Sequence, residues 1–354
     1  MKKKTGKPPR ETARRRHPGR VRVEDVARAA GVSGATVSRA LNRSGPVSED
    51  IRKRIERAVL DLGYVPNGAA RALASHRTRA IGIVVPTLKN ANFAVTAEAA
   101  EGRLVEEGYT FLVATNSYST SRESDLIQSL AAHGIDGLIL VGAQRDPAIL
   151  RFLDARGIPY VVTWTLARGD VPSVGFDNTE AARRLASHLL DLGHKQIGVI
   201  AGLTGSNDRA AARLAGVRQA LGERGLELSQ ELLIERPYRI AEGQIALGAL
   251  LDRAPPLTAI VCGNDQLAFG ALIECGRRGI EVPDELSIVG FDDLEFSSQI
   301  KPALTTIHVP AAEIGVRAAE YLLAKIAGRP APVTTTVSVS LIVRESSSPP
   351  RTAA

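Results

Sequence analysis

Apolar residues near the start of the chain recur with the 3.6-residue period of a helix that buries one face. The apolar positions of the first predicted helix are Val23, Val26, Ala27 and Ala30. Gly31 interrupts this pattern, and Ser33 is a suitable N-cap for a second helix over residues 34–42. Ser48 is a suitable N-cap for a third helix. The pattern therefore predicts three short helices in succession.

The second and third predicted helices also have one apolar face each. The inward positions are Val37 and Leu41 in the second helix, and Ile51, Ile55, Ala58, Val59 and Leu62 in the third. Basic residues 52–54 and Arg57 lie largely outside the apolar face of the third helix. We therefore expect the three helices to share one small core.

From Ala80 onward, short apolar runs alternate with segments of helical period. The runs are AIGIVV (80–85), TFLVAT (110–115), GLILVG (137–142), YVVTW (160–164), QIGVIAG (196–202), AIVCG (259–263) and LSIVGF (286–291). Such strands, separated by helices, are typical of parallel sheets that are covered on both faces. Their number predicts two lobes. The expected fold is thus α/β, with a small all-α headpiece and a two-lobed, doubly wound parallel-sheet domain.

These patterns divide the chain into five segments. We expect a basic disordered tail (1–20), a headpiece (21–66), a hinge helix and linker (67–79), a large domain (80–345) and a second disordered tail (346–354). Within the large domain, the first lobe takes about 80–178 and 309–337, and the second takes about 179–308 and 338–345. The hinge helix would span residues 68–75 after an Asn67 cap.

The first 79 residues and the rest of the chain differ in net charge. Residues 1–79 hold 20 Lys and Arg against 7 Asp and Glu, a net charge of +13, whereas the remaining residues sum to −6. A polyanion is therefore the expected partner of the first segment. The basic tail either adds phosphate attraction or is simply solvated. Its first 20 residues have no apolar core of a signal peptide, and no long apolar stretch follows, so we expect a cytoplasmic protein.

The spacing of the first two helices is that of a helix-turn-helix, whose second helix enters the major groove of DNA. With its apolar positions committed to the core, that helix leaves Gly34, Ala35, Ser38, Arg39 and Asn42 for DNA. Arg39 can donate a bidentate pair to guanine, and Ala35 can contact a thymine methyl group. Short polar groups suited to phosphates are Ser33, Thr36, Asn42 and Ser48.

Longer stretches of the sequence resemble the LacI family of repressors. VRVEDVARAAGVSGATVSRALN and VSEDIRKRIERAVLDLGYVPNGAARALA are similar to the family's headpiece and hinge. ARLAGVRQAL, AIVCGNDQLAFGAL, VPDELSIVGFDD and PALTTIHVP are similar to its periplasmic-binding-protein-like effector domain. The resemblance covers the chain from Val21 to about Glu345.

The resemblance implies a homodimer, or a larger assembly, that reads a pseudo-palindromic operator and is controlled by a small molecule. It places paired hinge helices in the minor groove, with contacts from Asn67, Ala70 and Leu73, and with Leu73 inserted at a central base step. A helix of about eight residues is marginal alone in water, so we expect it to order only on DNA beside a second hinge. The resemblance therefore implies a repressor.

Ligands of open α/β sheets lie beyond the carboxyl ends of the strands, where this chain places several polar residues. Carried over by resemblance, the expected effector-binding residues are Asn92, Phe93, Trp164, Asn207, Arg209, Arg213, Tyr238, Asn264 and Asp292. We expect Asp177, Asp265 and Asp293 to cap helices or brace loops instead. Many relatives carry an Asp where this chain has Thr163 before Trp164, so the sugar-binding role cannot simply be copied.

Two arginines four residues apart at a helix start can converge on one anionic group. Arg209 and Arg213 therefore favour a small acid or an acidic sugar as effector. The alternative is that Arg209 pairs with Asp208 or Asp292 as a brace, and Arg213 alone meets a neutral sugar.

Two other classes of protein are alternatives to a DNA-binding regulator. An α/β enzyme would need a catalytic motif, and the chain has no G-x-G-x-x-G, phosphate-binding loop, G-x-S-x-G or H-E-x-x-H sequence. A periplasmic solute-binding protein would lack the basic headpiece. We expect no enzyme activity, cofactor or metal, and we expect Cys262 and Cys275 to be buried reduced thiols. Whether the effector releases DNA or promotes its binding stays open.

Overall fold

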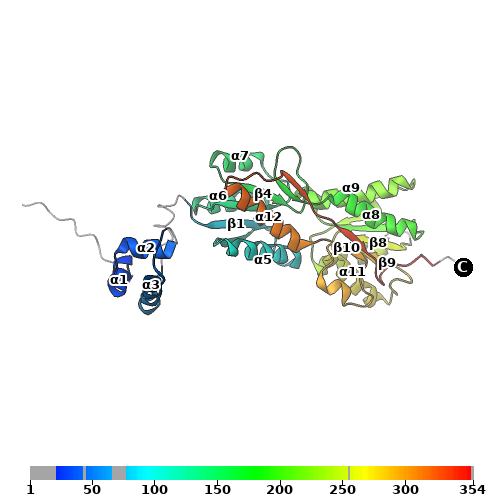
Figure 1. Cartoon of the computed structure of the whole chain (residues 1–354). Coiled ribbons are helices and arrows are strands. Elements are labelled where there is room, and N and C mark those ends of the chain that lie inside the picture. The colour runs from blue at the N-terminus through cyan, green and yellow to red at the C-terminus, as the bar shows by residue number, and fades with distance from the viewer. Residues whose placement is uncertain (1–20, 43–44, 66–76, 254–255, 352–354) are drawn as a thin grey trace, which may run out of the picture. The chain divides into compact units, whose positions relative to one another are not determined.

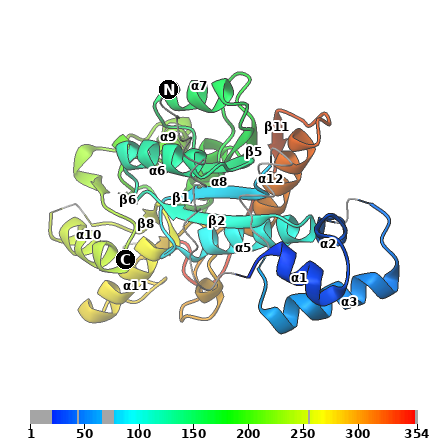
Figure 2. The same ribbon diagram turned by 90° about the vertical axis from the view of Figure 1, so that its left-hand side faces the viewer.

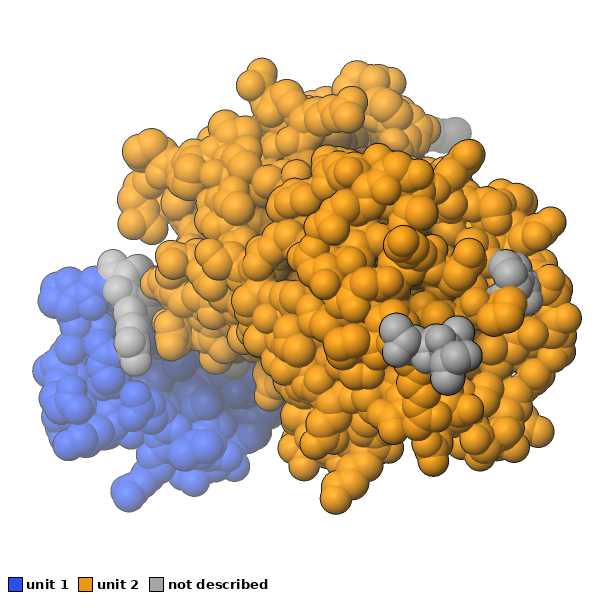
Figure 3. Space-filling model, turned by 90° about the vertical axis from the view of Figure 1, so that its right-hand side faces the viewer, with its two compact units in different colours: residues 1–76 blue, residues 77–354 orange. Residues whose placement is uncertain are grey.

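The computed structural model describes residues 21–42, 45–65, 77–253 and 256–351. The chain forms two compact units, Met1–His76 and Arg77–Ala354, which are coloured separately in Figure 3. Each unit has a hydrophobic core of its own. The predicted hinge segment, 68–75, lies outside the described residues.

The first unit contains three helices around one small core (Figure 1). They are α1 (Val23–Ala30), α2 (Gly34–Asn42) and α3 (Glu49–Leu62). Gly31 ends α1 in the left-handed conformation, with φ +63°, which favours glycine. The predicted inward residues Val37 and Ile55 are fully buried. Leu62 differs from the prediction because it is 36% exposed in the last turn of α3, where the helix extends past the core.

The first lobe of the second unit is built on a six-stranded parallel sheet, ordered β11-β5-β4-β3-β1-β2. Its strands are β1 (Ala80–Val85), β2 (Thr110–Thr115), β3 (Gly137–Val141), β4 (Tyr160–Thr163), β5 (Ser173–Gly175) and β11 (Thr334–Thr336). Helices α5 (Ala91–Glu106) and α12 (Ala311–Ile326) pack together on one face, and α6 (Thr120–Ala132) and α7 (Pro147–Ala155) cover the other (Figures 1 and 2).

The second lobe repeats this arrangement on a four-stranded parallel sheet, ordered β7-β6-β8-β9. Its strands are β6 (Ile197–Ala201), β7 (Leu233–Glu235), β8 (Ala259–Cys262) and β9 (Ser287–Val289). The paired helices are α8 (Asn178–Asp191) with α9 (Asp208–Glu223), and α10 (Ile240–Arg253) with α11 (Asp265–Arg278). Three short 3₁₀ turns complete it: η1 (Thr204–Ser206), η2 (Gln230–Leu232) and η3 (Glu295–Ser298).

The chain passes between the lobes at several points. One crossing leads from β5 into α8, and another leads from β10 (Thr306–His308), which pairs antiparallel with β12 (Ser340–Ile342), into α12. The large core runs across both lobes and includes Trp164, Phe176 and Phe291. Because the carboxyl ends of both sheets face this junction, side chains that follow the strands can meet there.

The C-terminal segment differs from the predicted disordered tail of residues 346–354. Ser346 is fully buried, and its hydroxyl donates to the Ile288 carbonyl at 2.6 Å. The His194 ring pairs with the Ser348 carbonyl at 2.8 Å. The segment up to Arg351 is therefore packed against the second lobe, because backbone pairing beside β9 continues past the apolar pattern. The last three residues lie outside the described part.

Two further predictions concern the composition of the chain. Cys262 and Cys275 are buried free cysteines, and burial raises the pKa of both thiols. In the part of the chain that the structure describes, no helix combines the length and apolar character that crossing a membrane requires.

Candidate functional site

The second helix of the headpiece exposes small and polar side chains. Ala35, Ser38 and Arg39 lie on the solvent side of α2, whereas Val37 and Ala40 are buried in the core with residues of α1 and α3. Burial of the opposite face fixes the rotation of α2 about its axis. Three of the predicted DNA-reading residues are therefore presented to solvent together.

Local hydrogen bonds organise the start of α2. The Ser33 hydroxyl oxygen accepts from the Thr36 amide at 3.1 Å and lies 2.9 Å from the Thr36 hydroxyl, which is the N-cap arrangement. The Arg39 guanidinium donates to the Ala35 carbonyl at 3.4 Å and to the Thr36 hydroxyl at 3.5 Å. Arg39 thus folds back along its own helix through two long, exposed bonds.

The other predicted DNA contacts are placed less completely. Gly34 begins α2 and is half-buried, and Ser48 caps α3 by accepting from the Ile51 amide at 3.5 Å. Asn42 is the last residue of α2, and its side chain is outside the described part of the structure. Three predicted residues lie wholly outside the described residues, namely Asn67, Ala70 and Leu73.

Two arginines of α3 contact the ends of the preceding helices. Arg52 donates to the Ala40 carbonyl at 3.3 Å, and Arg54 donates to the Ala30 carbonyl. The last carbonyls of a helix lack partners within it, and a basic side chain satisfies them. These two residues therefore contribute to the headpiece fold in addition to its positive charge.

In the second unit, Arg213 is the centre of a buried polar network between the lobes. Its guanidinium donates to the Asn178 side chain at 3.0 Å, to the Gly263 carbonyl at 2.8 Å and to Asp292 at 3.4 Å. It also lies 3.6 Å over the Phe291 ring. Arg213 thereby joins the start of α8 to the loops that follow β8 and β9.

Asp292 connects this network to the first lobe. Its carboxylate accepts from the Asn90 amide at 3.0 Å, and its backbone carbonyl accepts from the Asn92 side chain at 2.9 Å. Burial raises the pKa of the Asp292 carboxyl, against the lowering effect of Arg213. The predicted residues Asn92, Arg213 and Asp292 are therefore brought together, although they are far apart in the sequence.

Aromatic rings line the same junction. Phe93 meets Trp164 edge to face at 5.1 Å between ring centroids, and Tyr238 meets Tyr118 in the same way at 6.3 Å. Burial raises the pKa of both tyrosine hydroxyls. A Cβ atom at Gly202 would lie 2.3 Å from the Tyr238 ring, so the position of this ring depends on glycine there.

Three of the predicted effector residues hold buried polar atoms that have no hydrogen-bond partner among the described residues. These atoms are the Trp164 indole N–H, the Tyr238 hydroxyl and the Asn264 side-chain nitrogen. The Asn264 oxygen caps α11 by accepting from the Leu267 amide at 3.0 Å. An unpaired buried polar group costs about 1–3 kcal/mol, so three around one junction are a strong indication of a ligand site.

Backbone strain is concentrated at the same place. Tyr118, Trp164 and Asp292 have positive φ angles of 62°, 70° and 120°. Residues other than glycine rarely adopt this backbone conformation, which costs of order 1–3 kcal/mol per residue. Such residues cluster at binding sites because the local fold holds them in the geometry that a ligand requires.

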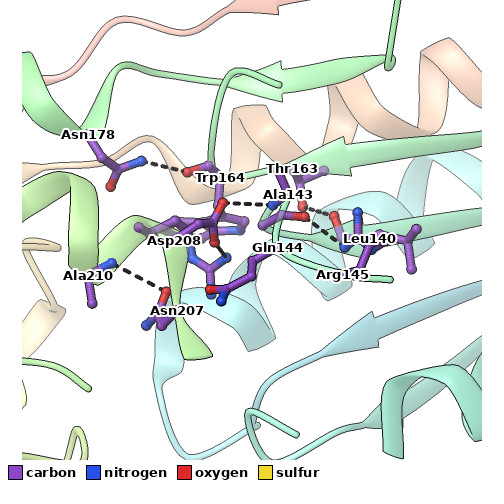
Figure 4. Close-up of polar contacts among 12 residues, drawn as sticks. Leu140, Ala143, Gln144, Arg145, Thr163, Trp164, Asn178, Asn207, Asp208 and Ala210 are labelled. Carbon is purple, nitrogen blue, oxygen red and sulfur yellow. Dashed lines mark hydrogen bonds and ion pairs between the residues drawn. The ribbon is translucent and has the colours of Figure 1, made fainter. Parts of the chain in front are cut away.

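The start of α9 forms the second-lobe wall. Asn207 caps this helix by accepting from the Ala210 amide at 3.4 Å. Asp208 accepts from the Ala143 amide of the first lobe at 2.7 Å and from the Arg209 guanidinium at 2.9 Å. Figure 4 shows the Asp208 carboxylate lying against Ala143, with Asn207 at the same helix start. This acidic side chain therefore bridges the two lobes.

Thr163 is turned away from the junction into the first lobe. Its hydroxyl donates to the Leu140 carbonyl at 2.9 Å (Figure 4), and the residue is fully buried. The next residue, Trp164, is held through its backbone carbonyl, which accepts from the Asn178 side chain at 2.9 Å. The end of β4 is thus neutral, and the Thr163 hydroxyl is engaged in a hydrogen bond within the first lobe.

Two cavities open beside the start of α9. One has a volume of about 320 Å³, which falls in the range of roughly 300–1,000 Å³ of small-molecule sites. Its walls include Lys89, Tyr118, Asn207, Tyr238 and Arg239. The other, of about 520 Å³, is lined by residues such as Arg145, Arg168, Phe176, Asn178 and Asp208.

The three acids that we expected to have structural roles do have them. Asp177 caps α8 by accepting from the Thr179 and Glu180 amides. Asp265 accepts from Leu294, Ser297 and Thr306, and Asp293 pairs with His308 and Arg344. Over the described residues, no group of three or more His, Cys, Asp or Glu side chains is arranged to hold a metal ion.

Sequence reasoning considered Asp208 only as an alternative partner of Arg209, and it missed three other residues of the site. They are Asn90, Tyr118 and Asn178. Each contacts or lies near a predicted residue from another part of the chain, such as Asn90 with Asp292 across 202 positions. The only sign of them in the sequence is that Asn90 and Tyr118 follow the ends of strands. This position does not identify the residues that they contact.

Comparisons with known proteins agree with this architecture. The family described as bacterial regulatory proteins, lacI family, matches residues 22–67, and the family of periplasmic binding proteins and sugar binding domain of LacI family matches residues 78–345. The HTH-type transcriptional regulator GntR of Pseudomonas aeruginosa is 38% identical over 88% of this chain and 91% of that protein.

Solved structures extend the likeness to three dimensions. The lac repressor dimer bound to operator and the anti-inducer ONPF is 28% identical, with a TM-score of 0.83 over 93% of this chain and all of that one. The complex of the transcriptional regulator CelR with cellobiose is 31% identical, with a TM-score of 0.68 over 92% of this chain and all of that one. The chain therefore belongs to the LacI family and is a DNA-binding transcriptional regulator with a ligand-binding domain.

Proposed function

We propose that the chain acts as a homodimeric repressor that reads a pseudo-palindromic operator through α2 and holds a small-molecule effector between the lobes of its second unit. The observation that carries the effector site is the set of unpaired buried polar atoms on Trp164, Tyr238 and Asn264 around the Arg213–Asp292 pair. A ligand with several hydroxyl or carboxyl groups can satisfy them.

The DNA-binding part of the proposal rests on exposure and charge. Ala35, Ser38 and Arg39 face solvent on α2, and the first 79 residues carry a net charge of +13. The two long bonds that hold Arg39 on its helix exchange readily for a guanine edge. Ser33, Thr36 and Ser48 lie at helix starts, where hydroxyls and free amides suit phosphates.

We assign the hinge contacts to Asn67, Ala70 and Leu73, which lie outside the described residues. Leu73→Ala should weaken operator binding far more than binding to random DNA, because an inserted apolar side chain acts only where the duplex can be kinked. Binding titrations on both DNAs at one salt concentration test this. Equal losses on the two DNAs would show that Leu73 has no such role.

Exposed apolar side chains on both lobes support the dimer. Val95 on α5 and Val113 on the edge strand β2 are exposed in the first lobe, and Ile273 on α11 and Phe296 on η3 are exposed in the second. The lac repressor relative is described as a dimer. Val95→Asp with Ile273→Asp should give monomers in sedimentation equilibrium. Ile245→Asp on α10, where the side chain is more exposed than Val95 or Ile273, should leave the dimer intact.

For the effector we favour a small carboxylate or acidic sugar. Arg209 and Arg213 are both buried at the start of α9. Because residue 163 is a neutral threonine, no carboxylate at this position repels an anion. The second candidate is a neutral sugar, because each arginine already faces an acid in this structure, Asp208 or Asp292, and because CelR is described with cellobiose.

Calorimetry with matched ligands decides between the two. The panel holds D-gluconate, D-glucuronate and D-ribonate, together with D-glucose and D-ribose. We expect an acid to bind wild type more tightly than its parent sugar, and Arg209→Gln to remove that preference. Tight binding of a neutral sugar that Arg209→Gln leaves unchanged would rule out the anionic effector. Operator titrations with the bound ligand then give the sign of regulation.

Two further parts of the proposal concern what the protein does not do. We expect no chemical change in the bound ligand, and we expect the protein to work in the cytoplasm, where its operator is. Proton NMR of the bound ligand during long incubation tests the first. Turnover of the ligand would revive an enzyme function.

A further inference from the structure

The Asp208 carboxylate, at the junction between the lobes, has two hydrogen-bond partners. The two oxygens of Asp208 are used separately, one accepting from the Ala143 amide at 2.7 Å and the other from the Arg209 guanidinium at 2.9 Å. Ala143 follows β3 in the first lobe, and Asp208 begins α9 in the second. A single side chain therefore ties the lobes together and neutralises an arginine of the proposed effector site.

Arg209 lies in a tightly defined position. Its guanidinium packs so closely on Gly142 that a Cβ atom there would lie 1.7 Å from the Arg209 Nη1 atom, and Gly142 has a φ of +77°. The positive charge of Arg209 lowers the pKa of Tyr118 and of Asp292 against the effect of their burial. Arg209 is thus near enough to the centre of the cleft to meet a ligand.

We propose that Asp208 is a positioning residue with two separable roles. It competes with an anionic ligand group for Arg209, and it connects the lobes through the Ala143 amide. The inference rests on the anionic effector proposed above. A ligand carboxylate that binds the Nη1 atom of Arg209 replaces Asp208 there. This competition lowers the affinity of the ligand and rejects weakly binding anions.

The geometry allows the two roles to be tested apart. Asp208→Asn removes the charge that holds Arg209 and keeps a side-chain oxygen for the Ala143 amide. Asp208→Ala removes both interactions. Gln144→Ala is the matched control, because Gln144 donates to the Gly205 carbonyl at 2.9 Å across the same junction and has no charge.

Hydrogen exchange of the ligand-free protein tests the connection between the lobes. The amide of Ala143 should exchange about tenfold faster in Asp208→Ala than in wild type, because its acceptor is gone. In Asp208→Asn it should exchange nearly as slowly as in wild type. Unchanged exchange in Asp208→Ala would overturn the role in connecting the lobes, and this result needs no ligand.

Calorimetry tests the competition with the same panel of acids and sugars. Asp208→Asn should bind the tightest acid, D-gluconate, D-glucuronate or D-ribonate, about tenfold more tightly than wild type. The parent sugar and Gln144→Ala should show no such gain. Acid binding by wild type with no gain in Asp208→Asn overturns the competition and leaves the proposed effector intact. Failure of every acid to bind either protein overturns both.

Discussion

The DNA-reading helix and the effector cleft use polar residues in opposite ways. On α2, Ser33, Thr36 and Arg39 are bonded to neighbours three or four positions away and stay near the surface. In the cleft, Arg213 and Asp292 are buried, and their partners lie 35 to 202 positions away. A surface that reads DNA needs only a small core to hold it, whereas the cleft exists only when both lobes are folded.

The largest expected effect is in the cleft. Arg213→Ala leaves Asp292 buried without its guanidinium, which should lower the free energy of unfolding by about 3–5 kcal/mol and abolish ligand binding. Arg218→Ala, an exposed position on the same helix, should change stability by less than about 0.5 kcal/mol. Denaturant unfolding of the full chain measures both.

A second variant keeps this prediction decisive if Arg213→Ala fails to fold. The double variant Arg213→Ala with Asp292→Asn removes the stranded charge and should recover part of the lost stability. Additive losses from the two substitutions would mean that the two side chains do not act as a pair.

Asp265 should make the stability of the second unit depend on pH. Burial, with the nearby Asp292 charge, raises the pKa of the Asp265 carboxyl to about 6, above about 3.9 in the unfolded chain. The folded state therefore binds this proton more tightly. The resulting stabilisation, about 3 kcal/mol, is present below pH 4 and is lost as the pH rises through 6.

The test compares wild type with Asp265→Asn between pH 4 and 7. The free energy of unfolding of wild type, minus that of Asp265→Asn, should decrease as the pH rises. Titration of surface groups occurs in both proteins and cancels in this difference. Parallel stability curves would show that Asp265 does not take up a proton in this range.

Much of the fold could be predicted from the sequence because its elements are long or strongly patterned. The first predicted apolar run is β1 at the same residues, 80–85, and the Gly31 interruption marks the end of α1. The short strands β5, β7, β10, β11 and β12 were missed, since three residues carry no period. The packing of Ser346 was missed because its partners, such as Ile288, are distant in sequence.

The site was predictable only in part, for a related reason. A strand-end rule locates Asp292 from sequence, and the resemblance supplies its expected role. No pattern shows that Asn90 holds Asp292 or that Asn178 holds Arg213. The sequence allows Arg209 to pair with Asp208 as an alternative to meeting a ligand, and it is the pairing in this structure. Only the folded lobes decide between such partners.

On the headpiece, we expect a smaller effect that is confined to DNA binding. Arg39→Ala should relax base preference at one position of each half-site and cost about 1–3 kcal/mol there, because a bidentate contact is lost. Stability should hardly change, since Arg39 is exposed. A panel of operator variants measures the preference, with Arg28→Ala on α1 as control. Full discrimination by the Arg39 variant would mean that another face of α2 reads the bases.

The smallest expected effect concerns the two helix caps of the headpiece. Ser33→Ala removes the acceptor of the Thr36 amide, a bond of 3.1 Å, and should cost about 1 kcal/mol of local stability. Ser48→Ala should cost less, because its bond to the Ile51 amide is 3.5 Å long. Hydrogen exchange of the full chain resolves the two helices separately. Both variants should weaken all operators alike, since phosphate contacts carry no sequence information. A larger loss from Ser48→Ala, or a change in base preference from either variant, would contradict the assignment of these hydroxyls to capping and phosphate binding.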